Sequence, residues 1–382
     1  MGLKMRKLIY PLVLAAAWLG MAAAADAANE SIGLSMEATP GPGGLYREVA
    51  RPIGASLTVT VTVPSESPKV TPIKVANVTF PEDMDFFPNK EKTPPCPDSA
   101  LNSQSNLAAG IAAIVDLCPK SVIGTGSSVV KLAKNNKDSF ANLTDPRLVI
   151  FNAGRNGKGR PKIVIYGYSK SVNAGLLMHG TLASDGQLRI EIGVMPFDSA
   201  VSEFTLGIPG EDLEVPDDSA PGGSRTVKGL DRAYLRGKCS TGTWLATGKF
   251  VLGERSDPSG VPVGEETLLS SNPFELPCEG KAGHAKLAIR AIKGPRKIKA
   301  RGKAGYVLTI SNPGTATATN LRLGATGAVT GTGKTGSLGP GESSKVRLPV
   351  VAGSRKGKGK IRFRVSANGS VRKESVRKIL VG

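Results

Sequence analysis

The sequence predicts an all-β protein built from antiparallel β-sandwich modules. Short runs in which valine, isoleucine and threonine alternate recur along the 382 residues, and 47 glycines and 27 prolines separate them. Long helical periodicity is almost absent, so strands joined by tight turns are favoured over helices. A chain of this length exceeds one ordinary hydrophobic core, and two or three domains are expected.

The N-terminal segment has the pattern of a cleaved signal peptide. Lys4, Arg6 and Lys7 precede an uncharged, mostly apolar run over residues 8–24, and small residues follow it. A permanent membrane anchor is the alternative, but the run contains Pro11 and no basic cluster follows it. We therefore expect residues 1–27 to be removed and the protein to be secreted or associated with the cell envelope, without a transmembrane anchor after cleavage.

Residues 28–280 are expected to form a β region. Strict alternation over residues 55–64 and again over 73–80 predicts strands with one buried face. Further strands are paired by hairpin turns, which we expect at Asn156-Gly157 and Asp185-Gly186. One stretch departs from this pattern, because residues 106–117 carry leucine and isoleucine at helical spacing and predict a single short helix.

A short internal repeat suggests how this β region is organised. Residues 78–86 (VTFPEDMDF) and 206–215 (LGIPGEDLEV) each contain a strand, a proline, an acidic pair and a second hydrophobic step. A pair of cysteines follows each copy. Two related modules, about 28–200 and 201–280, would produce this pattern, and so would one large sandwich with pseudo-symmetry.

The four cysteines are expected to form two structural disulfides. An even number of cysteines in an exported chain favours disulfides, and three connectivities are open. Pairing Cys96 with Cys118 and Cys239 with Cys278 is favoured, because each pair is then local. A metal or redox centre is the alternative, but the chain has no C-x-x-C motif and only two histidines. We expect no metal site and no cofactor.

The motifs that resemble catalytic sites are weak. Residues 328–335 (AVTGTGKT) fit a relaxed phosphate-loop pattern, but GSLGPGESS follows and does not start a helix, so a loop between strands is favoured.

His179, expected at the start of a strand, and His284, expected in a linker, lack the serine context of a hydrolase. Adjacent acids in loops leave a calcium site as a minor alternative. Trp244 and Phe250 are expected in the core rather than on a sugar-binding surface. The protein is therefore not expected to be an enzyme.

The C-terminal segment, residues 281–382, is strongly basic. It contains 13 lysines and 10 arginines but only Glu342 and Glu374 as acids, a net charge of +21 against +19 for the whole chain. Acidic residues become rare after the boundary near 279–286. The sequence from there to residue 382 contains about seven short predicted strands, which glycine, proline and asparagine separate. This spacing predicts an immunoglobulin-like β-sandwich over 281–382, with its last hairpin turn at Asn368-Gly369.

The same segment resembles a known family. The run YVLTISNPGTATATNLRLGAT, followed by GSLGPGESSKVRLPV, resembles the CARDB type of bacterial cell-surface Ig-like repeat. Asn312-Pro313-Gly314 matches the corner of that family, and residues 338–343 (LGPGES) match its turn. The resemblance implies an Ig-like fold and leaves the role open among spacer, adhesion unit and accessory domain.

The middle of the chain, about residues 90–280, is similar to uncharacterised disulfide-containing exported proteins of GC-rich bacteria. The shared features are Pro95-Cys96, the segment 118–126 (CPKSVIGTG), the segment 239–244 (CSTGTW) and Pro277-Cys278. This similarity implies architecture only.

Two cationic runs, residues 293–303 and 354–364, are the candidate binding residues. Such runs hold anionic cell-wall polymers or anionic membrane surfaces, although a solvated lysine-rich surface would have the same composition. Nucleic acid is not expected, because no aromatic residues alternate with the cations. We expect a structural, adhesive or scaffolding protein at the cell surface; the alternative is a glycan- or ligand-binding module with its site around Cys239 and Cys278. The candidate polyanion-binding residues are Lys293, Arg296, Lys297, Lys299, Arg301, Lys303, Arg355, Lys356, Lys358 and Lys360.

Overall fold

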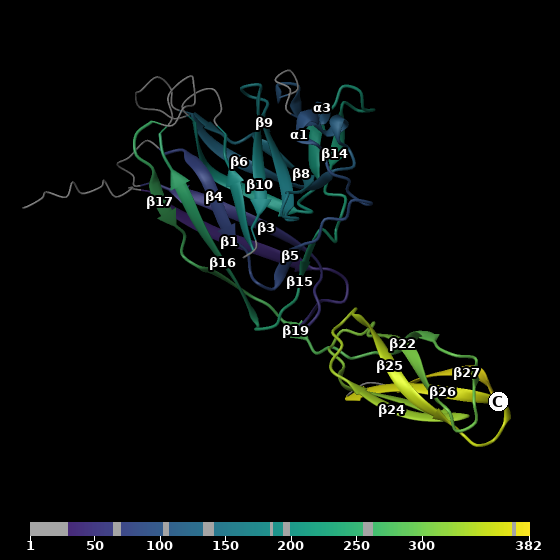
Figure 1. Ribbon diagram of the computed structural model, residues 1–382. Coiled ribbons are helices and arrows are strands. Elements are labelled where there is room, and N and C mark those ends of the chain that lie inside the picture. The colour runs from purple at the N-terminus through teal and green to yellow at the C-terminus, as the bar shows by residue number, and fades with distance from the viewer. Residues whose placement is uncertain are drawn as a thin grey trace, which may run out of the picture.

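The computed structural model describes residues 30–63, 70–101, 107–132, 141–183, 186–193, 199–254, 263–368 and 372–382. The expected signal peptide, residues 1–27, lies outside them. The described chain is all-β, as predicted, and its strands form a large curled sheet and a smaller β-sandwich (Figure 1). No helix among the described residues is long and apolar enough to cross a membrane.

The larger sheet is antiparallel throughout and gathers strands from residues 31 to 277. Its order is β17-β16-β4-β11-β10-β9-β8-β6-β12-β3-β15-β5, with β1 on β3, β18 on β16 and β7 on β6. The strands are β1 (Ser31–Pro40), β3 (Arg51–Thr62), β4 (Ile73–Thr79), β5 (Met84–Phe86), β6 (Val122–Leu132), β7 (Ala141–Leu143), β8 (Arg147–Arg155), β9 (Pro161–Ser169), β10 (Ala174–Leu182), β11 (Gln187–Glu191), β12 (Ser199–Ile208), β15 (Leu235–Gly237), β16 (Thr243–Leu252), β17 (Thr267–Ser270) and β18 (Phe274–Pro277).

Of the two arrangements that the internal repeat left open, the structure has one shared sheet rather than two separate modules. β12, from the proposed second module, pairs with both β3 and β6 of the first, and β16 pairs with β4. One hydrophobic core contains side chains from both halves, such as Val59, Val78 and Phe250. Residues 28–200 and 201–280 therefore share one sheet, because long-range strand pairing overrides the short sequence repeat.

The predicted alternation agrees with the structure in the strands that have one solvated face. In β3, Leu57, Val59 and Val61 are buried, while Thr58 and Thr60 point away from the core. The turn at Asn156-Gly157 joins β8 and β9 as expected, and the Asn156 side chain accepts hydrogen bonds from the backbone of the turn. Part of the Asp185-Gly186 turn and part of the Asn368-Gly369 turn lie outside the described residues.

A second layer covers the outer face of β8 and β9. It consists of α1 (Asp98–Leu101), α3 (Gly110–Leu117) and the hairpin of β13 (Leu213–Pro216) with β14 (Ser224–Val227). Side chains from this layer pack on Phe151 and Tyr166, so β8 and β9 are buried on both faces. This double burial explains why their sequences are continuous apolar runs rather than alternating ones.

The helix predicted over residues 106–117 is confirmed in part, because α3 covers residues 110–117, while residue 106 lies outside the described residues. The four-residue helix α1 lies before the predicted segment. Ile111 and Ile114 are buried as the spacing predicted, but Leu117 is 42% exposed. Val115 takes its place in the core, because a face built on positions 111, 114 and 115 satisfies the i, i+3, i+4 pattern.

Both disulfides have the favoured connectivity. Cys96 is bonded to Cys118 and ties the α1 segment to the end of α3. Cys239 is bonded to Cys278 and ties the segment between β15 and β16 to the residue that follows β18. The prediction of two local disulfides is confirmed, and no free cysteine remains.

A short pair of strands holds the chain where it leaves the larger sheet, near residue 280, the expected boundary of the C-terminal segment. Directly after Cys278, β19 (Gly280–Lys281) pairs in parallel with β2 (Leu45–Tyr46), and the Arg47 guanidinium donates to the Gly280 carbonyl at 3.0 Å. A further contact reaches the C-terminal part, where the Thr317 backbone amide donates to the Glu48 carboxylate at 2.7 Å. A hydrogen bond from the Thr317 side chain and the one from its backbone amide lower the pKa of Glu48.

The C-terminal part is a β-sandwich with its own core. Its strand order is β20-β22-β25-β24-β23-β26-β27-β21, and β24 passes between the two layers by pairing with β25 and then with β23. Tyr306 and Phe363 meet at the centre of the core, with ring centroids 5.0 Å apart. The strands are β20 (Ala288–Lys293), β21 (Lys297–Ile298), β22 (Lys303–Ser311), β23 (Thr319–Gly327), β24 (Val329–Thr335), β25 (Ser343–Ala352), β26 (Gly357–Asn368) and β27 (Lys373–Val381).

The two motifs that carry the CARDB resemblance contact each other. Asn312 is fully buried, and its amide donates to the carbonyls of Ala316 and Leu338 while its oxygen accepts from Gly314. The Gly341 amide, in the LGPGES turn, donates to the Asn312 carbonyl. Asn312 thus locks a corner of the sandwich. The Ig-like assignment itself stays a prediction.

The phosphate-loop-like segment is a strand rather than the expected loop. Residues 329–335 form β24, whose backbone pairs with β23 over residues 321–325. The backbone amides of a strand that is paired on its neighbour do not converge on a phosphate as a loop before a helix does. The glycines instead give β24 a thin profile where it crosses from one layer to the other; a Cβ at Gly331 would lie 2.3 Å from the Pro349 carbonyl.

Candidate functional site

The candidate site is the outer surface of one layer of the C-terminal sandwich, which we call the basic face. It consists of the solvent-directed side chains of β21, β23, β24, β26 and β27. In the sequence of these five strands the only acid is Glu374. The cations of the basic face are Lys297, Arg322, Lys334, Lys358, Lys360, Arg362, Arg364 and Lys378.

Strand periodicity produces this face. In β26 the side chains of Ile361, Phe363 and Val365 point into the core and are fully buried. Successive side chains of a strand alternate between its two faces, so the lysines and arginines at the even positions from 358 to 364 all point to solvent. A pattern that looks like a cationic run in the sequence is therefore a two-sided strand with one apolar and one basic side.

Strand register brings the two predicted cationic runs together. Lys358 of β26 lies opposite Leu380 of β27, and Leu380 lies opposite Lys297 of β21. The runs 293–303 and 354–364 are therefore joined across one intervening strand. A second junction lies at the end of the sandwich, where the Arg301 amide donates to the Gly353 carbonyl at 3.1 Å.

Like charges lie directly opposite each other on the basic face. Lys360 of β26 is the cross-strand partner of Lys378 of β27, and Arg322 of β23 is the partner of Lys334 of β24. Like charges in opposed positions destabilise a sheet. These pairs therefore do not contribute to the stability of the fold.

Glu374 is surrounded by three arginines. Its carboxylate lies 2.6 Å from Nε of Arg364, and 3.6 Å from Nε of both Arg362 and Arg372. One negative charge thus neutralises part of a cluster of three positive charges. An excess of guanidinium groups remains at this point, and guanidinium groups bind phosphate and carboxylate oxygens in a bidentate manner.

The ten predicted residues are all exposed, but the structure divides them among three places. Lys297, Lys358 and Lys360 lie on the basic face. Lys293 of β20 and Lys303 of β22 belong to the opposite layer. The others lie at the end of the sandwich, in the segments before β21, after β21 and before β26: Arg296, Lys299, Arg301, Arg355 and Lys356.

Sequence reasoning missed the larger part of the basic face. Arg322, Lys334 and Lys378 lie outside both cationic runs. Arg362 and Arg364 lie in the second run but were not among the ten predicted binding residues. The period-two spacing of residues 358–364 was a signal that could have found the last two. No local signal connects Lys334 with Arg322, because their contact depends on the pairing of β24 with β23.

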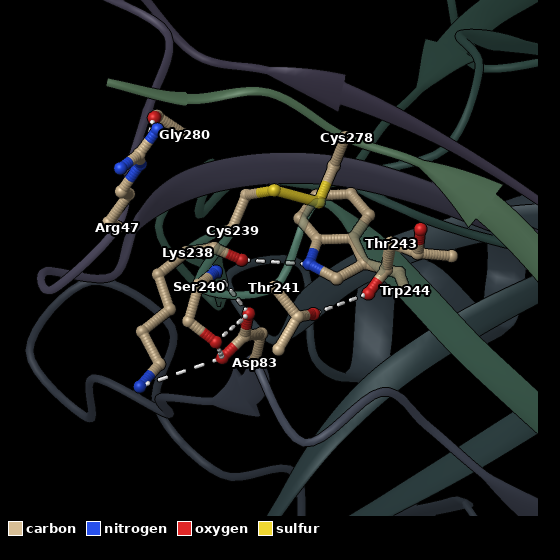
Figure 2. The surroundings of a disulfide bond; sticks show 10 residues. All are labelled: Arg47, Asp83, Lys238, Cys239, Ser240, Thr241, Thr243, Trp244, Cys278 and Gly280. Carbon is tan, nitrogen blue, oxygen red and sulfur yellow. Dashed lines mark hydrogen bonds and ion pairs between the residues drawn. A yellow bond between two sulfur atoms is a disulfide. The ribbon is translucent and has the colours of Figure 1, made fainter. Parts of the chain in front are cut away.

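The surroundings of the second disulfide, the alternative site, are filled by internal contacts (Figure 2). Asp83 accepts hydrogen bonds from the backbone amide and hydroxyl of Ser240, and Lys238 lies 3.5 Å from the same carboxylate. Trp244 is buried and donates from Nε1 to the Lys238 carbonyl at 2.8 Å, so the prediction that it belongs to the core is confirmed. Phe250 is also fully buried, as predicted.

A larger cavity lies elsewhere on the N-terminal region and is called the polar groove. It measures about 1440 Å³ and crosses the outer face of β3, β6 and β12. Hydroxyl side chains line it, including Thr58 and Thr205, whose Oγ1 atoms lie 2.8 Å apart. Asp231 also lines the groove; it is 2% exposed, and its Oδ2 atom has no hydrogen-bond partner among the described residues. A second cavity of about 60 Å³ lies in the apolar core.

The histidines lie in ordinary polar surroundings. His179 is in the middle of β10 rather than at a strand start, and its Nε2 atom lies 4.0 Å from Asp98 Oδ1. Lys162 binds the other oxygen of Asp98 at 3.3 Å. The His284 amide donates to the Thr315 hydroxyl next to the Asn312 corner. Within the described ranges, no three His, Cys, Asp or Glu side chains are grouped to hold a metal ion.

No protein-family model and no curated protein matches this chain.

Proposed function

We propose that this protein is an exported, non-catalytic cell-surface or extracellular β-protein with a structural, adhesive or scaffolding role. In this proposal the C-terminal sandwich holds the protein to anionic envelope material through its basic face. The N-terminal sheet, stabilised by two disulfides, is the part that is presented. The disulfides support an oxidising compartment, in agreement with the expected signal peptide.

One observation carries the proposal: the opposed like-charged pairs Lys360–Lys378 and Arg322–Lys334. A surface that served only for solubility would gain stability by alternating charge signs across neighbouring strands. An external polyanion relieves the repulsion of these pairs when it binds. A strongly basic surface also attracts such partners over a distance and releases their counterions.

The experiment that tests the proposal exchanges one charge and follows two properties. In the chain from residue 28, Lys378→Glu places an acid opposite Lys360. We expect the thermal unfolding temperature of the sandwich to rise slightly, because an opposed pair of like charges becomes an ion pair. We expect the affinity for sodium polyphosphate, and for purified cell-wall fractions, to fall about tenfold at low salt.

The matched control is Lys345→Glu. Lys345 lies opposite Thr309 on β25, in the other layer, so the variant has the same net charge without touching the basic face. Equal losses of affinity in the two variants would mean that net charge alone causes binding. Unchanged binding of Lys378→Glu would overturn the proposal.

The alternative function, a glycan- or ligand-binding module, is favoured by the polar groove rather than by the disulfide loops. A buried carboxylate oxygen of Asp231, which has no donor among the described residues, and a floor of hydroxyl groups suit a ligand that offers several hydroxyl donors. Filling the groove by Ser56→Leu should abolish glycan binding on an array and leave polyphosphate binding unchanged. If the wild-type chain binds no glycan, this alternative is rejected.

A further inference from the structure

Two aliphatic side chains are exposed among the cations of the basic face. Val376 is 56% exposed and Leu380 is 40% exposed, and both lie on the outer side of β27. Lys378 lies between them on the same strand. Exposed aliphatic side chains on one strand of a sheet cost solvation free energy unless a partner covers them.

Each aliphatic side chain has cations as its neighbours across the strands. Val376 lies opposite Arg362 of β26, and Leu380 lies between Lys358 and Lys297. The surface therefore alternates rows of apolar and cationic contact along β27. A partner that fits this surface must therefore offer both negatively charged groups and apolar groups. The two kinds of group must lie within one side-chain length of each other.

We propose that the basic face is a docking surface for a phospholipid bilayer with anionic headgroups. This inference rests on the proposed function and identifies its partner. The long, flexible lysine and arginine side chains bend back toward water and bind the phosphate oxygens of the headgroups, which allows the shorter valine and leucine side chains to approach the glycerol region below the phosphates. A soluble anionic polymer satisfies the cations but leaves Val376 and Leu380 in water.

Other occupants fit the surface less well. A second copy that docked through its own basic face would present the same positive charge, and repulsion opposes that contact. Single-stranded nucleic acid is recognised by aromatic stacking between cations, and the five strands of this face expose no aromatic side chain, since their one aromatic residue, Phe363, is buried. Charge complementarity together with the apolar rows therefore favours the lipid surface.

The test uses co-sedimentation of the chain from residue 28 with vesicles of phosphatidylcholine alone or with about one third phosphatidylglycerol. We expect binding only to the anionic vesicles. Val376→Ser should weaken this binding about fivefold, since a half-exposed valine loses its apolar contact. Binding of the same variant to soluble sodium polyphosphate should not change.

Val351→Ser is the matched control. Val351 is 42% exposed on β25, in the other layer, so its replacement should alter neither vesicle nor polyphosphate binding. If Val376→Ser binds anionic vesicles as the unmodified chain does, the lipid inference is overturned and a polymer partner remains. If Lys360→Gln combined with Lys378→Gln changes neither vesicle nor polyphosphate binding, the proposed function is overturned as well.

Discussion

The N-terminal sheet and the C-terminal sandwich both enclose a hydrophobic core between strands, but different features stabilise them. Both are all-β; the larger sheet is antiparallel, and so is the sandwich apart from the parallel pairing of β21 with β27. Each has a core that shares no residue with the other. The N-terminal region has both disulfides and a nearly balanced charge, whereas the C-terminal region has no cysteine and a net charge of +21. The difference shows that the smaller part depends on its core and its Asn312 corner while tolerating repulsion on its surface.

The first prediction breaks the C-terminal core. Phe363→Ala should destabilise the sandwich by about 3–5 kcal/mol, because a fully buried ring in contact with Tyr306 is removed. Hydrogen exchange should accelerate throughout residues 288–381 and stay unchanged in the N-terminal sheet. Acceleration in both regions would show that the two cores unfold together. Val376→Ala, on an exposed position of the same layer, is the control and should change stability little.

The second prediction removes the staple of the N-terminal region. Replacing Cys239 and Cys278 by serine should lower the stability of the larger sheet by about 4 kcal/mol in the chain-entropy model, given a sequence separation of 39. The same change at Cys96 and Cys118, separated by 22, should cost about 3 kcal/mol. Denaturant unfolding measures both. A C-terminal sandwich that loses equal stability would contradict the independence of the two regions.

The third prediction concerns the one acid of the basic face. Glu374→Gln should raise the affinity for sodium polyphosphate about threefold to fivefold, since three arginines lose their internal counter-charge. Isothermal titration at two salt concentrations measures the change, which should shrink at high salt. Glu342→Gln is the control, because Glu342 binds the Gly339 amide in a turn away from these strands. Lower affinity in Glu374→Gln would mean that Glu374 orients the arginines for binding.

The smallest expected effect is at the contact between the two regions. Hydrogen bonds from Thr317 lower the pKa of Glu48 from its ordinary value of 4.5, so the contact is stabilising above that value and is lost as the pH falls through the lowered pKa. Exchange of the Thr317 amide should therefore become faster in acid than intrinsic exchange accounts for. Glu48→Gln should remove this pH dependence. A pH-dependent excess that persists in the variant would assign it to another group.

Patterns that depend on neighbouring residues were predictable. The alternation of β3, the turn at Asn156-Gly157 and the pairing of the cysteines agree with the structure because each depends on local geometry. Outcomes that depend on distant segments were not predictable. The sequence left open whether residues 28–280 form two modules or one large sandwich, and the pairing of β12 with β3 and β6 decides for one shared sheet. The segment expected to be a loop at 328–335 forms a strand over residues 329–335 because β23 lies beside it.

The candidate site was only partly predictable for the same reason. Charge composition marked residues 281–382 as the basic part, and both cationic runs contributed to the basic face. The composition of the basic face depends on strand register, which the sequence does not reveal. Lys378 becomes a binding candidate because Lys360 lies opposite it. Leu380 becomes part of the proposed lipid contact because Lys297 and Lys358 flank it.

The sequence by itself determined the all-β class, the local disulfides and the concentration of positive charge, since composition, turn residues and short spacings are properties of the chain alone. The tertiary structure decided which side chains share a surface. Strand pairing joins residues that are tens of positions apart, and a shift of one residue in register would turn every side chain of a strand to the opposite face.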